Sequence, residues 1–248
     1  LLYLCLAHWR WFLLSLAVTL GIAIYYILST PNVYQRTASL MIKEDSKSQS
    51  IGSDVASMFS DMGLTGGKSN VNNELIAIQS PAVLLETGKQ LKLDVNYSVD
   101  GSFHPVSLYG KDLPVTVQFY GLTDEQSVDV DLQLELGNRL TITHISGVDK
   151  QGEAIDSNDE IHGRLGQTLH TPVCNIKVEA AAAYASYLRG GDAKPLHVSR
   201  TNLYAMTDHI KASLTASISE EKATVIDLTY KDQLTQRAED VLNTIIAV

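Results

Sequence analysis

The most distinct hydrophobic pattern in the chain is an apolar run near its start. Trp11 to Leu28 (WFLLSLAVTLGIAIYYIL) spans 18 residues without a charged side chain. As a helix this run would be about 27 Å long, close to the hydrocarbon thickness of a bilayer. Aromatic residues flank it, as in the belts of membrane helices: Trp9 and Trp11 at one end, Tyr25 and Tyr26 at the other. The pattern predicts a transmembrane helix.

A secretory signal and a buried core helix are two other interpretations of this run. A signal has an apolar region of about 7 to 15 residues and a small-residue cleavage site, whereas this run is longer and continues into Tyr25–Pro31. The membrane helix therefore fits best. Basic residues lie on both sides, so charge alone leaves the orientation open; they are Arg10 before the run and Arg36, Lys43 and Lys47 after it.

Alternating and then weakly patterned residues follow the apolar run. Val33 to Lys43 alternates as a half-buried strand does, with Tyr34, Leu40 and Ile42 on one side. Residues 44–70 are rich in Ser and Gly, which predicts a loop containing at most one short amphipathic turn between Val55 and Met62.

Helical spacing returns beyond this loop. Asn72 to Gln79 predicts a short helix, and Ser80 followed by Pro81 predicts the start of a second one that ends near Leu91. Three more helices are expected later in the chain. The first covers Glu179 to Leu188, and the second starts at a Ser199 cap and runs through Leu203, Met206 and Ile210. The third starts near Asp232 and has an apolar stripe of Leu234, Ala238, Leu242 and Ile245.

The middle of the chain and a segment near its end predict strands. The middle strands are Val115 to Tyr120, Leu132 to Leu136, Arg139 to Ile145 after a Gly137-Asn138 turn, and Thr168 to Val178. Leu214 to Ser219 and Thr224 to Tyr230 predict a hairpin closed by the charged turn 220–222. The order of elements indicates an α+β domain tethered close to a membrane.

Composition excludes some partners. The net charge is −9, and no basic cluster appears, so we expect no nucleic-acid partner. Cys5 lies at or before the apolar run and Cys174 lies far beyond it, so each is expected to be an isolated thiol. Cys174 falls in a strand pattern, where a structural role is the ordinary one.

The segment Gly63–Ser69 (GLTGGKS) ends like a phosphate-binding loop. The Walker pattern G-x-x-x-x-G-K-[ST] would place a glycine at position 62, where the chain has Met62. The pattern also needs a helix that begins at the Lys-Ser, whereas Asn70-Val71-Asn72-Asn73 follows. The spacing therefore favours a solvated loop over a nucleotide site.

Other chemical motifs are equally incomplete. Asp156–Glu160 has the D-x-N-x-E spacing of a calcium loop, but Ile161 stands where that loop needs glycine. No G-x-S-x-G elbow occurs, and no histidine pair has the spacing of a metal site; the histidines in question are His104, His144, His162, His170, His197 and His209. The sequence therefore predicts no catalytic, cofactor-binding or metal-ligating residue in this chain. It predicts a membrane-anchored binding or assembly module.

Four segments resemble the chain-length-determinant (Wzz-type) family of polysaccharide co-polymerases. Thr30–Ile42 (TPNVYQRTASLMI) resembles the strand with which that family leaves the membrane, with one extra residue between Pro31 and Tyr34. Glu74–Leu84 (ELIAIQSPAVL), continuing to Leu93, is similar to the helix that follows.

The other two segments lie in the second half of the chain. Leu165–Val178 (LGQTLHTPVCNIKV) is similar to a strand pair of the family, with Cys174 where a glycine is usual. Ala223–Asp232 followed by Ala238–Asn243 resembles the family's last strand and the helix after it. Each motif is structural, and together the four cover most of the chain in the family's order.

The resemblance implies a bacterial inner-membrane protein with one span in this chain. Residues 1–30 would be the membrane helix with a cytoplasmic flank, and residues 31–248 a periplasmic co-polymerase domain. That domain would be a ferredoxin-like α+β fold with an extra β insertion and a long C-terminal helix. The implied function is regulation of the chain length and export of capsular polysaccharide or exopolysaccharide, through oligomeric scaffolding and without catalysis by this chain.

The resemblance also implies partners. They are membrane lipid, other copies of the chain in a ring, a polymerase or outer-membrane export protein, and the nascent polysaccharide. Both ends of the sequence look cut from a longer protein, because the chain lacks an initiator Met and its last residues keep a helical pattern. In the larger, Wzc-like members a second span and a cytoplasmic tyrosine autokinase follow, so ATP and Mg²⁺ would belong to a segment beyond Val248.

Two other classes of protein fit the same order of elements. A sensor or chemoreceptor ectodomain also places an α+β module between membrane helices, and a signal-anchored periplasmic hydrolase would end soon after Val248. The identity of the polysaccharide, the ring size and the residues that contact the polymer do not follow from the sequence.

Overall fold

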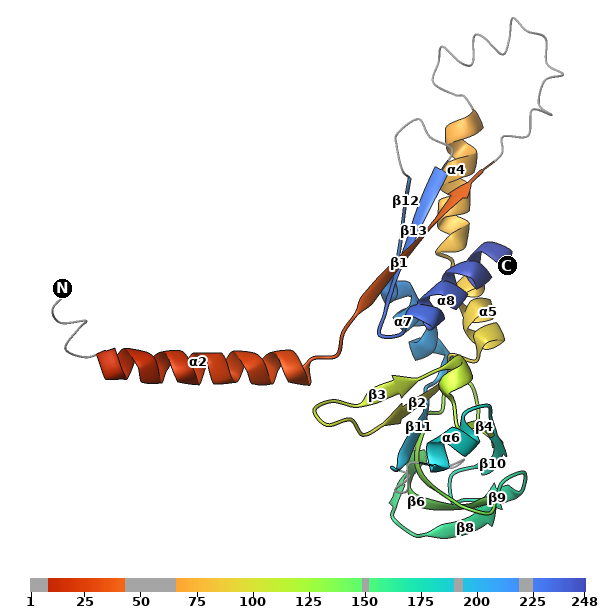
Figure 1. Cartoon of the computed structure of the whole chain (residues 1–248). Coiled ribbons are helices and arrows are strands. Elements are labelled where there is room, and N and C mark those ends of the chain that lie inside the picture. The colour runs from red at the N-terminus through yellow and green to blue at the C-terminus, as the bar shows by residue number, and fades with distance from the viewer. Residues whose placement is uncertain (1–8, 43–65, 149–151, 190–193, 219–224) are drawn as a thin grey trace, which may run out of the picture.

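The computed structural model describes residues 9–42, 66–148, 152–189, 194–218 and 225–248, of which residues 66–70 are described by their backbone only. In this part of the chain it is a mixed α+β protein with an N-terminal apolar helix and three antiparallel sheets. Figure 1 shows a rod-like helix projecting from a body that has two modules, one above the other.

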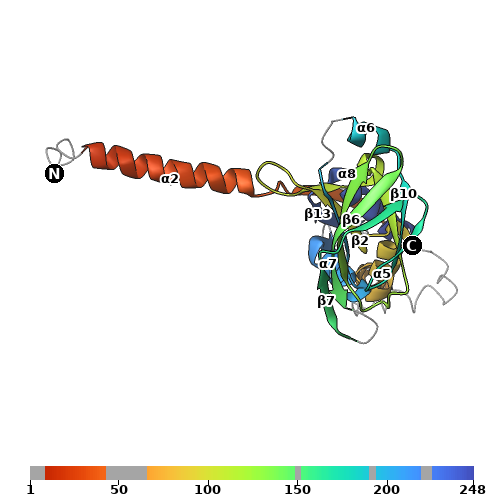
Figure 2. The same ribbon diagram turned by 90° about the horizontal axis from the view of Figure 1, so that it is seen from below.

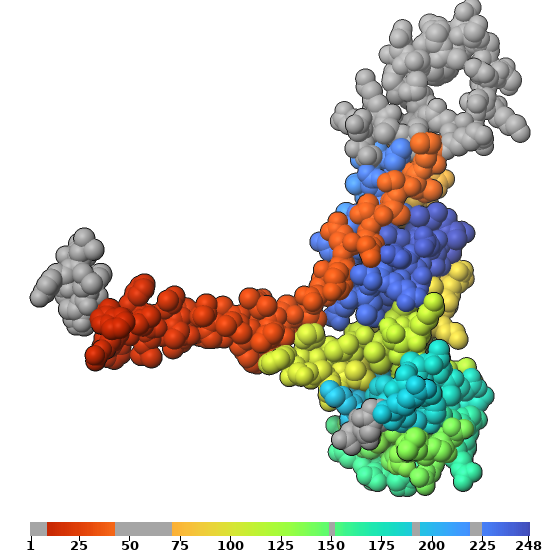
Figure 3. Space-filling model, viewed as in Figure 1, coloured from red at the N-terminus to blue at the C-terminus, as the bar shows by residue number. Residues whose placement is uncertain are grey.

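The rod is helix α2 (Trp9–Ser29), which is long and apolar enough to cross a membrane. Its most apolar stretch of 18 residues has a mean hydropathy of 2.1, and no residue of that stretch is buried in the structure. The space-filling view in Figure 3 shows α2 standing clear of the body over most of its length. A helix that is apolar on every side and has no protein around it is typical of a membrane span.

The upper part of the body, here called the α/β module, is built on the strand that follows α2. Strand β1 (Tyr34–Met41) pairs along its whole length with β13 (Val225–Asp232), which also pairs with β12 (Leu214–Ile218). The three strands form one antiparallel sheet in the order β1-β13-β12. The chain thus leaves α2 directly into a sheet whose other strands come almost 200 residues later.

Helices cover one face of this sheet. Helix α8 (Thr235–Ala247) packs on β1 and β13, while α4 (Gly66–Ile78) and α7 (Leu203–Ser213) pack on β12. Helix α5 (Pro81–Leu91) lies on α7 and α8. The resulting core contains Val71, Ile78, Leu84, Leu203, Met206, Ile210, Leu214, Ile226, Leu228, Tyr230, Ala238, Val241, Leu242 and Ile245.

Helices α5 and α7 approach each other closely at a glycine. A Cβ placed on Gly88 would lie 2.3 Å from Met206 Cε and 3.2 Å from Ile210 Cδ1. Any larger residue at this position would require the end of the Met206 side chain to shift, so glycine suits the close approach of the two helices. The helix α5 itself begins where Ser80 accepts a hydrogen bond from the Val83 amide, with Pro81 at the first helical position.

The lower part of the body, here called the β module, is a continuous insertion between α5 and α7. Its seven-stranded sheet has the order β3-β2-β11-β5-β6-β7, with β8 also paired to β6. The strands are β2 (Val95–Val99), β3 (Val106–Leu108), β5 (Val128–Glu135), β6 (Arg139–Val148), β7 (Ala154–Ser157), β8 (Ile161–Arg164) and β11 (Leu196–Arg200).

A second, three-stranded sheet closes the β module. It has the order β4-β10-β9, from β4 (Val115–Tyr120), β9 (Thr168–His170) and β10 (Asn175–Ala180). The 3-10 helix η2 (Gly110–Asp112) and helix α6 (Tyr184–Leu188) connect its strands to the larger sheet. Buried side chains of both sheets form one core separate from that of the α/β module, and Figure 2 shows the module from below.

A buried tyrosine links the two sheets of the β module. The amide of Val117 on β4 donates a 2.8 Å hydrogen bond to the hydroxyl of Tyr97 on β2. Burial is the main reason that the pKa of Tyr97 is raised, and the Asp94 charge adds to it, although the Val117 bond opposes the shift. The hydroxyl thus satisfies a backbone donor that no strand partner reaches.

Several expected elements are confirmed. They are the apolar helix, the strand after it, the helix from Pro81 to Leu91, the strand Val115–Tyr120, the hairpin of β12 and β13, and the last helix with Ala238, Leu242 and Ile245 buried. The predicted turn of β5 and β6 at Gly137-Asn138 is also present, and both residues have positive φ. The predicted amphipathic turn at Val55–Met62 and the charged turn 220–222 lie outside the described residues.

The predicted loop 44–70 was wrong at its end, because α4 begins at Gly66. Glycine and asparagine are poor helix formers, so local propensity argued against a helix there. Packing on β12 supplies what propensity lacks, since Val71 and Ile78 are both buried in the α/β core.

Three boundary predictions in the second half were also wrong. The single strand Thr168–Val178 is divided between β9 and β10 by a turn in which Thr171 Oγ1 donates to Cys174 O at 2.7 Å. The helix expected over Glu179–Leu188 is reduced to α6, because β10 continues to Ala180 in pairing with β4. Ser199 lies inside β11, and Asn202 caps α7 by accepting from the Ala205 amide at 2.7 Å.

We predict that Tyr97→Phe destabilises the protein by roughly 1–3 kcal/mol, because the buried Val117 amide loses its acceptor. Thermal unfolding of the detergent-solubilised chain, followed by circular dichroism, measures the effect. Tyr204→Phe is the matched control, since Tyr204 is 65% exposed and its substitution should leave the melting temperature unchanged. Equal melting temperatures for the two variants would contradict the role given to Tyr97.

Candidate functional site at the junction of the two modules

The most chemically distinct site in the described residues lies where the two modules meet. There the end of β13 turns into α8, and the start of β2 and the end of β11 approach from the β module. Asp232, the last residue of β13, is 7% exposed although it is charged. A buried charge needs a partner, so the site is defined by what surrounds this carboxylate.

Arg237 on the first turns of α8 is that partner. Its Nε lies 2.7 Å from Asp232 Oδ2 and its Nη2 lies 2.8 Å from Oδ1, which is the bidentate geometry of a strong arginine–carboxylate pair. The Leu234 amide also donates to Asp232 Oδ1 at 2.8 Å. The carboxylate therefore both neutralises the arginine and satisfies an amide at the start of α8.

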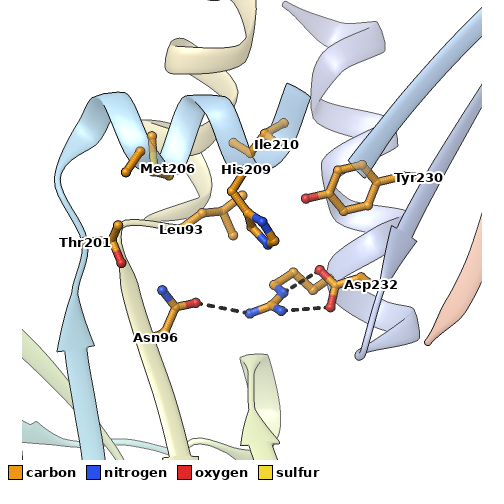
Figure 4. Close-up of a pocket in the computed structure, with 10 residues that line it drawn as sticks. Leu93, Asn96, Thr201, Met206, His209, Ile210, Tyr230 and Asp232 are labelled. Carbon is orange, nitrogen blue, oxygen red and sulfur yellow. Dashed lines mark hydrogen bonds and ion pairs between the residues drawn. The ribbon is translucent and has the colours of Figure 1, made fainter. Parts of the chain in front are cut away.

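The same arginine reaches across to the β module. Its Nη1 lies 3.3 Å from Oδ1 of Asn96 on β2. Asn96, Arg237 and Asp232 line a small cavity of ≈ 90 Å³, as do residues of α7 and β13. Figure 4 shows His209, Tyr230 and Asp232 directed into this cavity. The dashed contacts of the ion pair end on Asp232, below His209 and Tyr230.

Burial and charge act together on Tyr230, which closes one side of the cavity. Burial of its ring, followed by the negative charge of Asp232, raises the pKa of Tyr230 to about 12, against the opposing effect of Arg237. The hydroxyl therefore stays protonated at physiological pH and acts as a donor or neutral acceptor. His209 and Met206 complete the lining from α7.

A second set of contacts joins the modules beside the cavity. The Ser107 hydroxyl on β3 donates to Gln233 Oε1 at 3.0 Å. Tyr109 forms a side-chain hydrogen bond with Asp240 on α8; burial first, then the Asp240 charge and this bond, raise the pKa of Tyr109 to about 12. Next to it, Gly110 has a φ of +61° and lies against the Gln236 side chain.

The loop 121–127 of the β module holds the start of α7 on the other side. The Leu203 amide donates to Asp124 O at 2.9 Å, and the Asn202 amide donates to Ser127 Oγ at 3.0 Å. Arg200, only 9% exposed, donates from Nη1 to two carbonyls of the same loop at 2.9 Å each. The orphan donors at this helix start are thus satisfied by the neighbouring module.

The junction is suited to mechanical coupling and to holding water or a small polar molecule. Its charges are already paired with one another, so it presents no free carboxylate cluster for a cation. Among the described residues, no group of three or more His, Cys, Asp or Glu side chains could hold a metal ion. The ion pair therefore fixes the end of β13 against α8, and the hydrogen bonds of Arg237 to Asn96 and of Ser107 to Gln233 join this part to the β module.

A second polar cluster lies on the outer face of the seven-stranded sheet. Ser98, His197, Asp131 and His144 lie opposite one another on the adjacent strands β2, β11, β5 and β6. His197 Nδ1 lies 2.6 Å from Asp131 Oδ1, and its Nε2 lies 3.3 Å from Asp100 Oδ1. The pair of carboxylates holds one imidazole between them.

Serine, histidine and aspartate in one row suggest a hydrolytic triad, which the geometry does not favour. In a triad one ring nitrogen faces the serine and the other faces the carboxylate. Here the second ring nitrogen of His197 faces Asp100 instead, so both nitrogens contact carboxylates. The arrangement stabilises an imidazolium rather than preparing a base.

The motifs considered in the sequence lie far from the junction. Lys68 and Ser69 belong to α4, so the expected absence of a helix at these residues was wrong, although the Walker spacing still fails; Gly63–Thr65 lie outside the described residues. Asp156–Glu160 forms the turn between β7 and β8, where Ser157 Oγ donates to Asp159 Oδ2 at 3.0 Å. Burial is the main cause that raises the pKa of Cys174, consistent with a structural thiol.

Sequence reasoning missed the junction residues as a site. The sequence indicated Asp232 only as the approximate start of the last helix. Arg237 follows five residues later, whereas side chains that pair on a helix are three or four residues apart. His209 and Asn96 come from elements that the sequence leaves far apart. The only available signal was that Asp232 falls on the same face of the strand as the apolar residues Ile226 and Leu228.

No family model matches the chain, and no curated protein matches it. The described residues define an α+β protein with an N-terminal helix able to cross a membrane.

We predict that Asp232→Ala destabilises the protein by about 3–5 kcal/mol, because it leaves the Arg237 guanidinium buried without its counter-charge. Denaturant unfolding of the solubilised chain measures the loss. The double variant Asp232→Ala/Arg237→Ala should lose less than the sum of the two single variants, since the uncompensated charge is removed.

Arg36→Ala is the matched control for this ion pair. Arg36 pairs with Glu239 at 3.0 Å, but their side chains are 45% and 54% exposed, so the loss should be at most about 1 kcal/mol. If Asp232→Ala costs no more than Arg36→Ala, the Asp232–Arg237 pair does not stabilise the packing of α8 on β13.

The second polar cluster gives a pH prediction. Burial lowers the pKa of His197, but the hydrogen bonds and charges of Asp131 and Asp100 raise it by more, so the pKa lies above the ordinary 6.5. The stability that protonated His197 contributes is therefore full below about pH 6.5 and is lost as the pH rises through the raised value.

Melting temperatures of the wild type and His197→Gln, compared from acidic pH to about pH 9, test this. The difference should be largest at acidic pH and shrink as the pH rises. His170→Gln is the control, because His170 Nδ1 contacts the neutral amide of Asn175 at 2.8 Å. A difference that grows with pH would show that the sign is wrong.

Proposed function

We propose that this chain is the membrane-anchoring and periplasmic part of a Wzz-type polysaccharide co-polymerase. In this role it regulates the length and export of a capsular polysaccharide or exopolysaccharide as an oligomeric scaffold, without catalysis by its own residues. Helix α2 spans the bacterial inner membrane, and both modules lie in the periplasm. The partners are lipid, further copies of the chain, the polymerase or an export protein, and the nascent polymer.

One observation carries the proposal: three of the four resembling segments, which are scattered in sequence, assemble into one core. Thr30–Ile42 becomes β1, Glu74–Leu93 becomes α4 and α5, and the segment from Ala223 supplies β13 and α8. Leu84, Ile226 and Ala238, one from each of α5, β13 and α8, are fully buried in the α/β core. The fourth segment forms the β9–β10 pair of the β module.

The arrangement of elements supports a scaffold more than an enzyme. A small antiparallel sheet follows directly after the apolar helix and has helices on one face. This arrangement is compatible with a ferredoxin-like domain into which the β module is inserted. The strongest polar contacts of the described residues pair charges within each module, and weaker hydrogen bonds such as Arg237–Asn96 and Ser107–Gln233 join the modules. We assign ATP and Mg²⁺ to a cytoplasmic tyrosine kinase that, in Wzc-like members, follows a second span outside this chain.

The sensor ectodomain is the second candidate, and the junction cavity is the observation that favours it. Its ≈ 90 Å³ accommodate a few water molecules or a very small solute between two modules that a ligand would hold together. A receptor would be expected to work as a dimer, whereas the co-polymerase requires a larger closed assembly.

The test is the oligomeric mass of the detergent-solubilised full-length protein, by native mass spectrometry, together with polymer length in cells. We expect a closed assembly of several protomers, and an altered polysaccharide length distribution on gels when the gene is deleted. Wild type and Arg36→Ala should restore the distribution, while Asp232→Ala should not.

Two results would overturn the proposal. A monomeric full-length protein that supports wild-type polymer length would show that no scaffold is needed. A stable dimer, with polymer length unchanged by deletion, would favour the sensor, and the chain would then be screened for small ligands.

A further inference from the structure

The turn between β2 and β3 reaches the end of α2. His104 Nδ1 lies 3.1 Å from the carbonyl oxygen of Leu28, although the two residues are 76 positions apart. Figures 1 and 2, which view the protein from directions 90° apart, both show the β2–β3 turn beside the C-terminal end of α2. This contact ties the β module to the helix end.

The position of Leu28 fixes the depth of this turn. With 21 residues, α2 is about 31 Å long at 1.5 Å per residue, which matches a hydrocarbon core of about 30 Å. The apolar run ends at Leu28, so the Leu28 carbonyl lies at the edge of the hydrocarbon when α2 spans the bilayer. A side chain 3.1 Å from that carbonyl must lie at the same level.

The contact also has a chemical reason. The last four carbonyls of a helix have no partner within it, and an unpaired carbonyl is costly close to hydrocarbon. The Thr30 amide and hydroxyl both donate to Tyr26 O, at 3.1 and 2.8 Å. His104, with its Nδ1 carrying a proton, supplies a donor for Leu28 O from a distant part of the chain.

The turn presents an aromatic residue at this level. Phe103 is 58% exposed and Val106 is 44% exposed. The turn is tightly folded, because a Cβ on Gly101 would lie 2.2 Å from the His104 carbonyl oxygen. The described segment 100–108 (DGSFHPVSL) contains neither lysine nor arginine, so its attraction to a bilayer would be apolar and not electrostatic.

We propose that the β2–β3 turn is a membrane-contact element that docks on the phospholipid interface at the point where α2 leaves the bilayer. Phe103 is the contacting residue, since aromatic side chains favour the headgroup region. A single exposed phenylalanine is ordinary on a protein surface, and its place beside the end of the helix gives it this role. The β module is then held to the membrane at a second point besides the chain connection at β1.

The proposal rests on α2 spanning a bilayer, as the proposed function requires, and it is tested in nanodiscs of phosphatidylcholine containing the whole chain. Trp9 and Trp11 are the only tryptophans, so Trp9→Phe/Trp11→Phe gives a background in which Phe103→Trp is the sole reporter. The matched control is Tyr204→Trp in the same background, at a site on α7 that is 65% exposed.

We expect lipids brominated near the headgroup to quench the tryptophan at position 103 at least about twofold more than the one at position 204. The turn would hold position 103 at the lipid interface, close to the bromine atoms. High salt should not reduce this quenching, since no basic residue takes part. Adding His104→Ala should weaken it by freeing the turn from α2.

In the unmodified chain, quenching of Trp9 and Trp11 by lipid shows whether α2 is inserted, and so distinguishes failure of this proposal from failure of the proposed function. If lipid quenches Trp9 and Trp11 but the tryptophan at position 103 behaves like that at position 204, the turn does not touch the bilayer and only this proposal is overturned. If lipid does not quench Trp9 and Trp11 either, α2 is not inserted, and both this proposal and the proposed function are overturned.

Discussion

The described structure depends on one buried ion pair. Asp232 ends the central strand of the small sheet, and Arg237 opens the helix that covers it, so their bidentate contact fixes the angle between strand and helix. The remaining guanidinium nitrogen extends to Asn96 on the other module. Burying two charges is costly, and such a pair contributes more to a unique arrangement than to net stability. Here the pair fixes the position of Arg237, from which one hydrogen bond extends to the β module.

The two modules have separate apolar cores and meet through polar contacts. Apolar cores hold each module together, while side-chain bonds such as Ser107–Gln233 and Tyr109–Asp240 join them. Domain interfaces of this polar kind allow relative motion more readily than apolar ones. Tyr34 at the start of β1 pairs with Asp232, so this joint lies close to the C-terminal end of α2.

Local sequence signals predicted the elements whose periodicity is strong. The apolar run, the Ser80-Pro81 helix start and the stripe ending in Ile245 each have one dominant period, and each was confirmed. Segments that packing stabilises were missed: the first turns of α4, before the predicted helix from Asn72, contain Gly66 and Gly67, and β2 and β11 are short strands fixed by each other. The junction site could not be predicted, because Asn96, His209 and Arg237 converge only through the tertiary fold.

The pairing of β1 with β13 has a consequence for how the protein is made. Thr37 and Thr229, which face each other in this pair, are 192 positions apart, so the sheet of the α/β module cannot close until the residues of β13 have left the ribosome. The β module is continuous in sequence and has its own core, so it can fold while its surroundings are incomplete. Strand β1, held near the translocation site by α2, would meanwhile expose an unpaired edge that awaits its partner. The sheet that continues from α2 is therefore completed only after the β module has been made.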